Sequence, residues 1–79
     1  MLLCKVTGSV ISTRKNEKLK GCKFLIVKPV EGSQSFVAID QIGAGVGETV
    51  LVAQGSAARL SAPQSDTPID AAVVGIIDE

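Results

Sequence analysis

The apolar residues of this chain fall into five short runs, separated by glycine, proline and polar residues. In the first run, residues 2–10, the even positions are apolar or small, while Lys5, Thr7 and Ser9 stand between them. This alternation predicts a strand with one side facing a core and the other facing solvent. The remaining runs are short enough to be strands as well. The five runs are residues 2–10, 24–27, 36–39, 49–53 and 71–77.

Five short strands in 79 residues predict a closed or nearly closed barrel, because closure removes the unpaired sheet edges that otherwise invite aggregation. We expect an all-β fold class, with an OB-like five-stranded barrel occupying residues 1–79 as a single domain. One short helix is expected at residues 57–60, with Ser56 as its N-cap. Polar segments at 14–21, 31–35 and 61–68 are expected to be loops and turns.

Several of these strands are apolar on both sides. Hydrophobic residues make up 46% of the chain and the mean hydropathy is +0.37, which is high for a chain this small. A small barrel fills its interior with one side of each strand, so an apolar outer side must be covered by another apolar surface. If ~400 Å² of outer apolar surface is covered per chain, burial contributes roughly 10 kcal/mol before ordering costs. The pattern predicts self-association.

The residue types present exclude several kinds of chemistry. The chain has no histidine, so imidazole catalysis and histidine metal ligation are excluded. Cys4 and Cys22 do not form a CxxC motif and are interpreted as reduced, buried thiols; a disulfide does not fit a cytoplasmic setting. No apolar stretch reaches the ~20 residues of a membrane helix, and the first residues do not look like a signal peptide. We expect a cytoplasmic protein without membrane contact.

The glycine-rich segment at residues 43–48 is the most conspicuous motif, but it does not predict a phosphate site. Its glycines are followed by a strand rather than by a helix N-terminus, and it lacks the lysine of a P-loop. A structural role in close backbone approach is expected. Asp66 and Asp70 are interpreted as exposed loop acids, and Phe24 and Phe36 as core residues. No active site, metal site or cofactor site is predicted.

The charges are divided unevenly along the chain. Residues 1–28 carry seven bases and one acid, whereas residues 29–79 carry one base, Arg59, and seven acids. The basic run from Arg14 to Lys23 leaves open a second hypothesis, an OB-like module that binds single-stranded nucleic acid through this loop. Nucleic acid is not the expected partner, because the net charge is zero and no exposed aromatic cluster accompanies the lysines.

Several motifs together point to a family. They are residues 1–10 with 19–21, 37–40, 43–52 (GAGVGETVLV), 55–59 (GSAAR) and 70–78 (DAAVVGIID). In this order and spacing they resemble the vertex proteins of bacterial microcompartments, the EutN/CcmL family. The connection at residues 31–35 is shorter than in many members.

The resemblance implies a function without catalysis. Members of that family form OB-like barrels with a short helix and assemble as cyclic pentamers, which cap the fivefold corners of a polyhedral shell built from hexameric tiles. The resemblance therefore implies a homopentamer in a carboxysome or metabolosome shell in the cytoplasm, with hexameric shell proteins as partners and no cofactor.

Twelve residues are candidates for the subunit interface or the fivefold axis. The glycine-rich loop is expected near a subunit contact or the axis, the short helix against a neighbouring subunit, and the last strand shared between barrel and interface. Arg59 is expected to meet an acid, since it is the only base among residues 29–79. The candidates are Gly43, Ala44, Gly45, Gly47, Glu48, Ser56, Ala57, Ala58, Arg59, Asp70, Val73 and Ile76.

Overall fold

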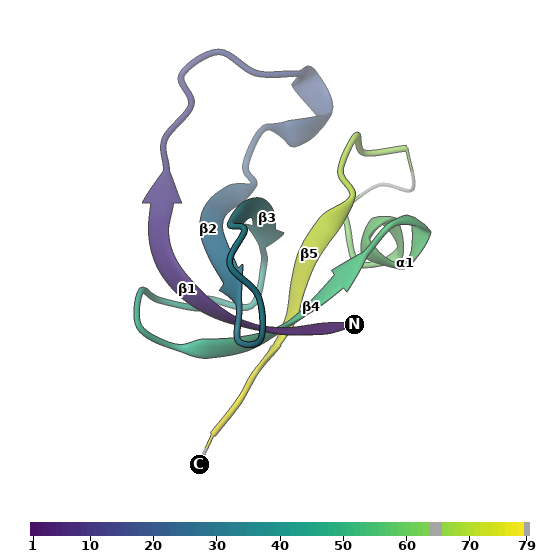
Figure 1. Ribbon diagram of the computed structural model, residues 1–79. Coiled ribbons are helices and arrows are strands. Elements are labelled where there is room, and N and C mark those ends of the chain that lie inside the picture. Colours follow the sequence, from purple (N-terminus) through teal and green to yellow (C-terminus); the bar gives the residue numbers. More distant parts are fainter. Residues whose placement is uncertain (64–65, 79) are drawn as a thin grey trace.

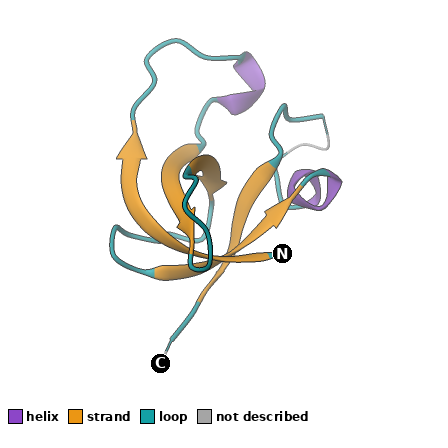
Figure 2. Ribbon diagram, in the orientation of Figure 1, coloured by secondary structure: helices purple, strands orange, loops and turns teal. Residues whose placement is uncertain are grey.

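Five strands close into a barrel with one short helix on its outside (Figure 1 and Figure 2). The computed structural model describes residues 1–63 and 66–78. Around the barrel the strand order is β1-β2-β3-β5-β4, and all neighbours are antiparallel except β3 and β5. The expected all-β fold class and five-stranded barrel are confirmed. The elements are β1 (Leu2–Val10), a 3-10 helix (Glu17–Leu19), β2 (Lys23–Pro29), β3 (Phe36–Asp40), β4 (Thr49–Gln54), α1 (Ser56–Leu60) and β5 (Ala71–Ile76).

Alternate residues of the strands fill the barrel interior. Every strand contributes to this core, and most of the side chains are small or β-branched, as a narrow barrel requires. Partly buried Leu2, Phe36 and Ile76 pack against it. The inward positions are apolar because they are buried in this core. Its buried members are Cys4, Val6, Leu25, Val27, Ala38, Ala44, Val50, Val52, Ala71 and Val73.

A second, smaller core lies outside the barrel. Ile39 of β3 and Ala72 of β5 point outward and pack with Cys22 and with Ala58 of α1. Phe24 of β2 packs against this cluster and is partly buried. The chain therefore covers part of its own outer apolar surface. The outer apolar area left for another chain to cover is therefore smaller than the sequence predicts.

A β-bulge in β1 changes the predicted alternation. Val6 is opposite Val27 and Gly8 is opposite Ile26, so Thr7 is an extra residue in the ladder. Before the bulge the even positions face the core, as expected; after it, Gly8 and Val10 face outward. The prediction that all even positions of this strand face inward is wrong beyond Val6, because the bulge reverses the sides.

The helix begins at Ser56, one residue earlier than predicted, and its N-cap is Gly55. Gly55 adopts φ 65° and ψ −140°, a conformation that glycine adopts and residues with a Cβ avoid. The chain turns into the helix at this glycine, so Ser56 is the first helical residue rather than the cap. The expected thiols are confirmed, since Cys4 and Cys22 are both free and buried. No helix in the described ranges is long and apolar enough to cross a membrane.

Candidate functional site

Asp40, the last residue of β3, holds the first half of the glycine-rich loop. Asp40 is 4% exposed, and its carboxylate accepts hydrogen bonds from the backbone N–H groups of three residues. Ile42 N donates to Oδ1 over 2.9 Å, Ala44 N donates to Oδ2 over 2.8 Å, and Gly43 N lies 3.2 and 3.3 Å from the two oxygens. An ionised carboxylate makes stronger hydrogen bonds than a neutral acceptor. Asp40 therefore fixes the path of the chain as it leaves the barrel.

The second half of the loop is held by β1. Gly47 N donates to the carbonyl oxygen of Val6 over 2.8 Å, and Val6 N donates to the carbonyl oxygen of Glu48 over 2.9 Å. The Glu48 side chain folds back and accepts a 2.6 Å hydrogen bond from Gly45 N. Gly47 has φ 95°, where a Cβ would be strained. The loop is therefore held at both ends. The positive φ at Gly43 and Gly47 fits the structural role that the glycine pattern predicts.

The pinned loop presents apolar groups to solvent. Ile42 and Val46 are more than half exposed, whereas Ala44 lies inside the barrel core. Lys23 Nζ donates to the carbonyl oxygen of Ala44 over 3.0 Å and links the loop to β2. A rigid loop that exposes branched aliphatic side chains is suited to contact another protein surface.

The candidates on and after α1 lie in a different place. Ser56, Ala57, Arg59 and Asp70 are exposed, whereas Ala58 is buried in the second core. Arg59 Nη1 donates to the carbonyl oxygen of Ile69 over 3.3 Å. Neither of the two ion pairs found among the described residues involves Arg59. Its expected acidic partner is not among the described carboxylates of its own chain.

The β5 candidates serve the barrel itself. Val73 is buried in the interior and Ile76 packs against the same core. Val73, Ala44 and Ala58 lie inside the protomer, so they can influence a subunit contact only through the backbone they support. Ile76 is only partly buried. The glycine-rich loop precedes β4 and α1 follows it, so the two exposed groups of candidates are separated by the length of that strand, about 17 Å.

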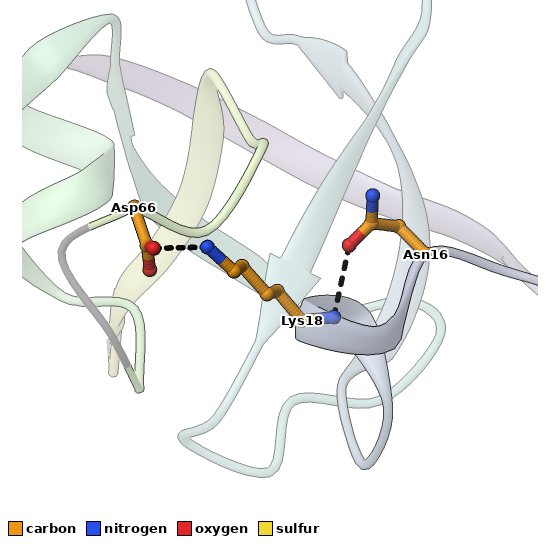
Figure 3. Close-up of polar contacts among 3 residues, drawn as sticks. All are labelled: Asn16, Lys18 and Asp66. Carbon is orange, nitrogen blue, oxygen red and sulfur yellow. Dashed lines mark hydrogen bonds and ion pairs between the residues drawn. The ribbon is translucent and has the colours of Figure 1, made fainter.

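The basic loop between β1 and β2 is partly neutralised by the chain's own acids. Lys18 forms an ion pair with Asp66, and the Asn16 side chain accepts a hydrogen bond from Lys18 N over 2.9 Å (Figure 3). Lys20 Nζ forms a second ion pair with Glu17 Oε2, at 2.7 Å. The hydrogen bond from Lys18 lowers the pKa of the Asp66 carboxyl below its ordinary value. Pairing of two of these lysines leaves less free positive charge for a nucleic acid than the sequence suggested.

The described residues contain no group of three or more acidic or cysteine side chains placed to hold a metal ion. Cys4 lies in the barrel interior, and burial raises the pKa of its thiol. A thiol in this setting is a poor nucleophile, because the thiolate is the reactive form.

Known proteins are similar in sequence to this chain over nearly its whole length. The sequence model of a family described as "Ethanolamine utilisation protein EutN/carboxysome" matches residues 1–78. The chain belongs to the EutN/CcmL family. It is 48% identical to the bacterial microcompartment shell vertex protein GrpN of Rhodospirillum rubrum, over 99% of this chain and 93% of GrpN. It is 49% identical to the carboxysome shell vertex protein CcmL of Synechocystis sp., over 99% of this chain and 83% of CcmL.

The barrel of this EutN/CcmL family member superposes on solved structures of its relatives. The pentameric microcompartment shell protein GrpN from Rhodospirillum rubrum gives a TM-score of 0.90 at 46% identity, covering 100% of this chain and 95% of GrpN. An ethanolamine utilization protein EutN gives a TM-score of 0.93 at 42% identity, covering 100% of this chain and 88% of that one. The family resemblance seen in the sequence is confirmed.

Proposed function

We propose that this protein is a structural component of a bacterial microcompartment shell, a homopentamer that closes the fivefold vertices. The observation that carries the proposal is the match of the entire barrel to GrpN, a pentameric shell protein, at 46% identity. Such a protein acts through its shape and its contacts, and we assign it no catalytic activity. Its location is the shell of a carboxysome or a metabolosome.

The fivefold ring has a geometric purpose. A flat layer of hexagonal tiles cannot close on itself. Fivefold units inserted among the tiles introduce the curvature of a polyhedron. A ring arises when one surface of a chain binds a different surface of the next copy and the rotation closes. We propose that hexameric shell proteins are the partners around the rim of the pentamer.

The candidate contact residues remain part of this proposal. The loop containing Gly43, Gly45, Gly47 and Glu48 is proposed to lie at a subunit contact or near the fivefold axis. Its support is the rigid backbone and the exposed aliphatic side chains that the loop carries. Arg59 is proposed to pair with a carboxylate of a neighbouring copy, because it is exposed and unpaired with the described acids of its own chain.

Native mass spectrometry of the purified protein at neutral pH and moderate salt tests the oligomeric state. The expected species has a mass of about 40 kDa, five times the 8.1 kDa of one chain. Co-expression with hexameric shell proteins, followed by electron microscopy for closed polyhedra, tests the partner and the vertex role. A monomer of 8.1 kDa would contradict the proposal and direct attention to the basic loop, where a salt-dependent gel shift would test nucleic-acid binding.

A further inference from the structure

One end of the barrel has a hollow that we name the open mouth. The strand pairings place the starts of β1, β3 and β5 at the same end of the barrel as the ends of β2 and β4. The hollow at this end has a volume of about 490 Å³, and every strand contributes to its lining. The mouths of β-barrels are among the places where small molecules bind, in hollows of ~300–1,000 Å³. The lining includes one residue from each strand: Leu2, Pro29, Phe36, Gln54 and Ala71.

The opposite end of the barrel is closed by the glycine-rich loop, which connects the end of β3 to the start of β4. Ala44 of this loop is 1% exposed and lies in the barrel core. Among the described residues it is the one buried member of that core that comes from outside the strands. The described connections at the open mouth therefore add no buried residue to the core, and the hollow remains at that end.

The floor of the open mouth is apolar. Leu2 and Phe36 pack against the barrel core but are only partly buried, whereas Ala71 is buried in it. An aliphatic group in the hollow would cover the exposed parts of Leu2 and Phe36. Removal of this apolar area from water favours binding.

The rim of the open mouth is polar and carries a negative charge. Gln34 and Ser35 of the β2–β3 turn, Gln54 at the end of β4 and Asp70 before β5 all line the hollow and are exposed. Among the described lining residues, Asp70 alone has a charged side chain. Asp70 belongs to neither of the two ion pairs found within the described ranges. Its carboxylate is therefore available to a ligand.

The pairing of β4 with β5 holds Asp70 in place. Gly55 N donates to the carbonyl oxygen of Asp70 over 2.8 Å. This hydrogen bond is directly beside the ladder pair formed by Gln54 and Ala71. The backbone at Asp70 is therefore fixed by main-chain contacts, which a change of its side chain leaves in place.

The chemistry of the rim and floor selects a class of ligand. A carboxylate and amide oxygens accept hydrogen bonds, and an ammonium group brings both a positive charge and three N–H donors. An anionic ligand would be repelled by Asp70. We propose that the open mouth binds a small organic ammonium ion, with its charged group at Asp70 and an aliphatic stem against Leu2 and Phe36. This site goes beyond the proposed shell function and does not depend on the ring for its formation.

The test uses three probes with the same six-carbon stem and different head groups: hexylammonium, 1-hexanol and hexanoate. Each probe is titrated into the wild-type protein at pH 7, and the shifts of the backbone amide signals of Leu2, Phe36 and Ala71 are followed by NMR. Asp70→Asn removes the charge and keeps the shape of the side chain. Asp78→Asn is the matched control, because Asp78 is an exposed acid beyond the end of β5, at the opposite end of the barrel.

We expect hexylammonium to bind the wild type and Asp78→Asn equally, and Asp70→Asn about fivefold more weakly, as the loss of an exposed ion pair predicts. For the wild type, 1-hexanol should bind more weakly than hexylammonium, and hexanoate more weakly still. Equal affinity for the three probes, or unchanged binding of hexylammonium to Asp70→Asn, would overturn the assignment of an ammonium ligand. If no probe shifts these amides, the open mouth is not a binding site. The comparison of the probes on the wild type holds even if Asp70→Asn does not fold.

Discussion

Replacing Asp40 should destabilise the protein, because its carboxylate holds the first half of the glycine-rich loop. In Asp40→Ala the buried N–H of Ala44 loses its acceptor, which costs about 1–3 kcal/mol. The N–H groups of Ile42 and Gly43 are nearer to water and lose about 0.5–1 kcal/mol each. The expected loss in unfolding free energy is about 3 kcal/mol, a large part of the total for a domain of this size.

Asp40→Asn removes the negative charge and one acceptor oxygen but keeps the shape of the side chain. Asn keeps one of the two acceptor oxygens, so we expect roughly half of the loss seen with alanine. The matched control is Glu31→Gln, which removes an exposed carboxylate from the β2–β3 turn and should change stability by less than ~0.5 kcal/mol. The expected order of stability is wild type and Glu31→Gln, then Asp40→Asn, then Asp40→Ala.

Urea unfolding followed by far-UV circular dichroism measures these differences; the chain has no tryptophan or tyrosine, so intrinsic fluorescence is a poor signal. All variants are compared at one subunit concentration, because the apparent stability of an oligomer depends on it. In a thermal scan a loss of this size lowers Tm by roughly 12–24 °C. If the unfolding free energy of Asp40→Ala lies within ~0.5 kcal/mol of the wild-type value, the carboxylate does not hold the loop and the reasoning is refuted.

Three further predictions concern the loop, the core and the surface. Gly45→Val should weaken the ring while leaving the fold intact, because a Cβ there meets only Glu48 Oε1 at 3.5 Å; an unchanged oligomer mass would place Gly45 away from the contact. Thr67→Val should raise the unfolding free energy by about 1 kcal/mol, because the buried Thr67 hydroxyl has no hydrogen-bond partner among the described residues. A variant that is less stable than the wild type in the same urea assay would show that the hydroxyl is hydrogen-bonded. Asp66→Asn should destabilise slightly at neutral pH. Lys18 lowers the pKa of Asp66 in the folded state. The contribution of this ion pair to the free energy of unfolding is therefore fully present above the ordinary Asp pKa of about 3.9, and it is lost as the pH falls through the lower pKa of the folded state. A difference between wild type and variant that stayed constant from pH 7 to pH 2 would contradict this.

The strands could be predicted because their pattern is local. Each run of alternating or continuous apolar residues became a strand within one or two residues of the expected bounds. The bulge at Thr7 could not be predicted, because it depends on the register with β2, and register is a property of two strands. This single extra residue decides that Gly8 faces outward rather than into the core.

The candidate site was predicted in part, for a related reason. The glycine pattern indicates a tight loop, but the group that holds the loop is Asp40, which precedes it. An aspartate at the end of a strand before a glycine-rich turn is a usable signal, since its side chain commonly accepts hydrogen bonds from the following N–H groups. The outer apolar positions could be predicted only in general terms, because the part of them that α1 covers is decided when the barrel folds.

The two sides of its strands explain how so small a chain can have separate surfaces for folding and for assembly. The five strands pair around a closed ring, so a neighbouring copy must be recognised mainly through side chains on the outside of the barrel. The core uses one side of each strand, and α1 covers one part of the other side. Substitutions at Val27 or Val52, which lie in that core, should therefore lower the free energy of unfolding. That separation follows from the two-residue period of a strand, and it is what makes the excess of apolar residues in this chain compatible with a stable fold.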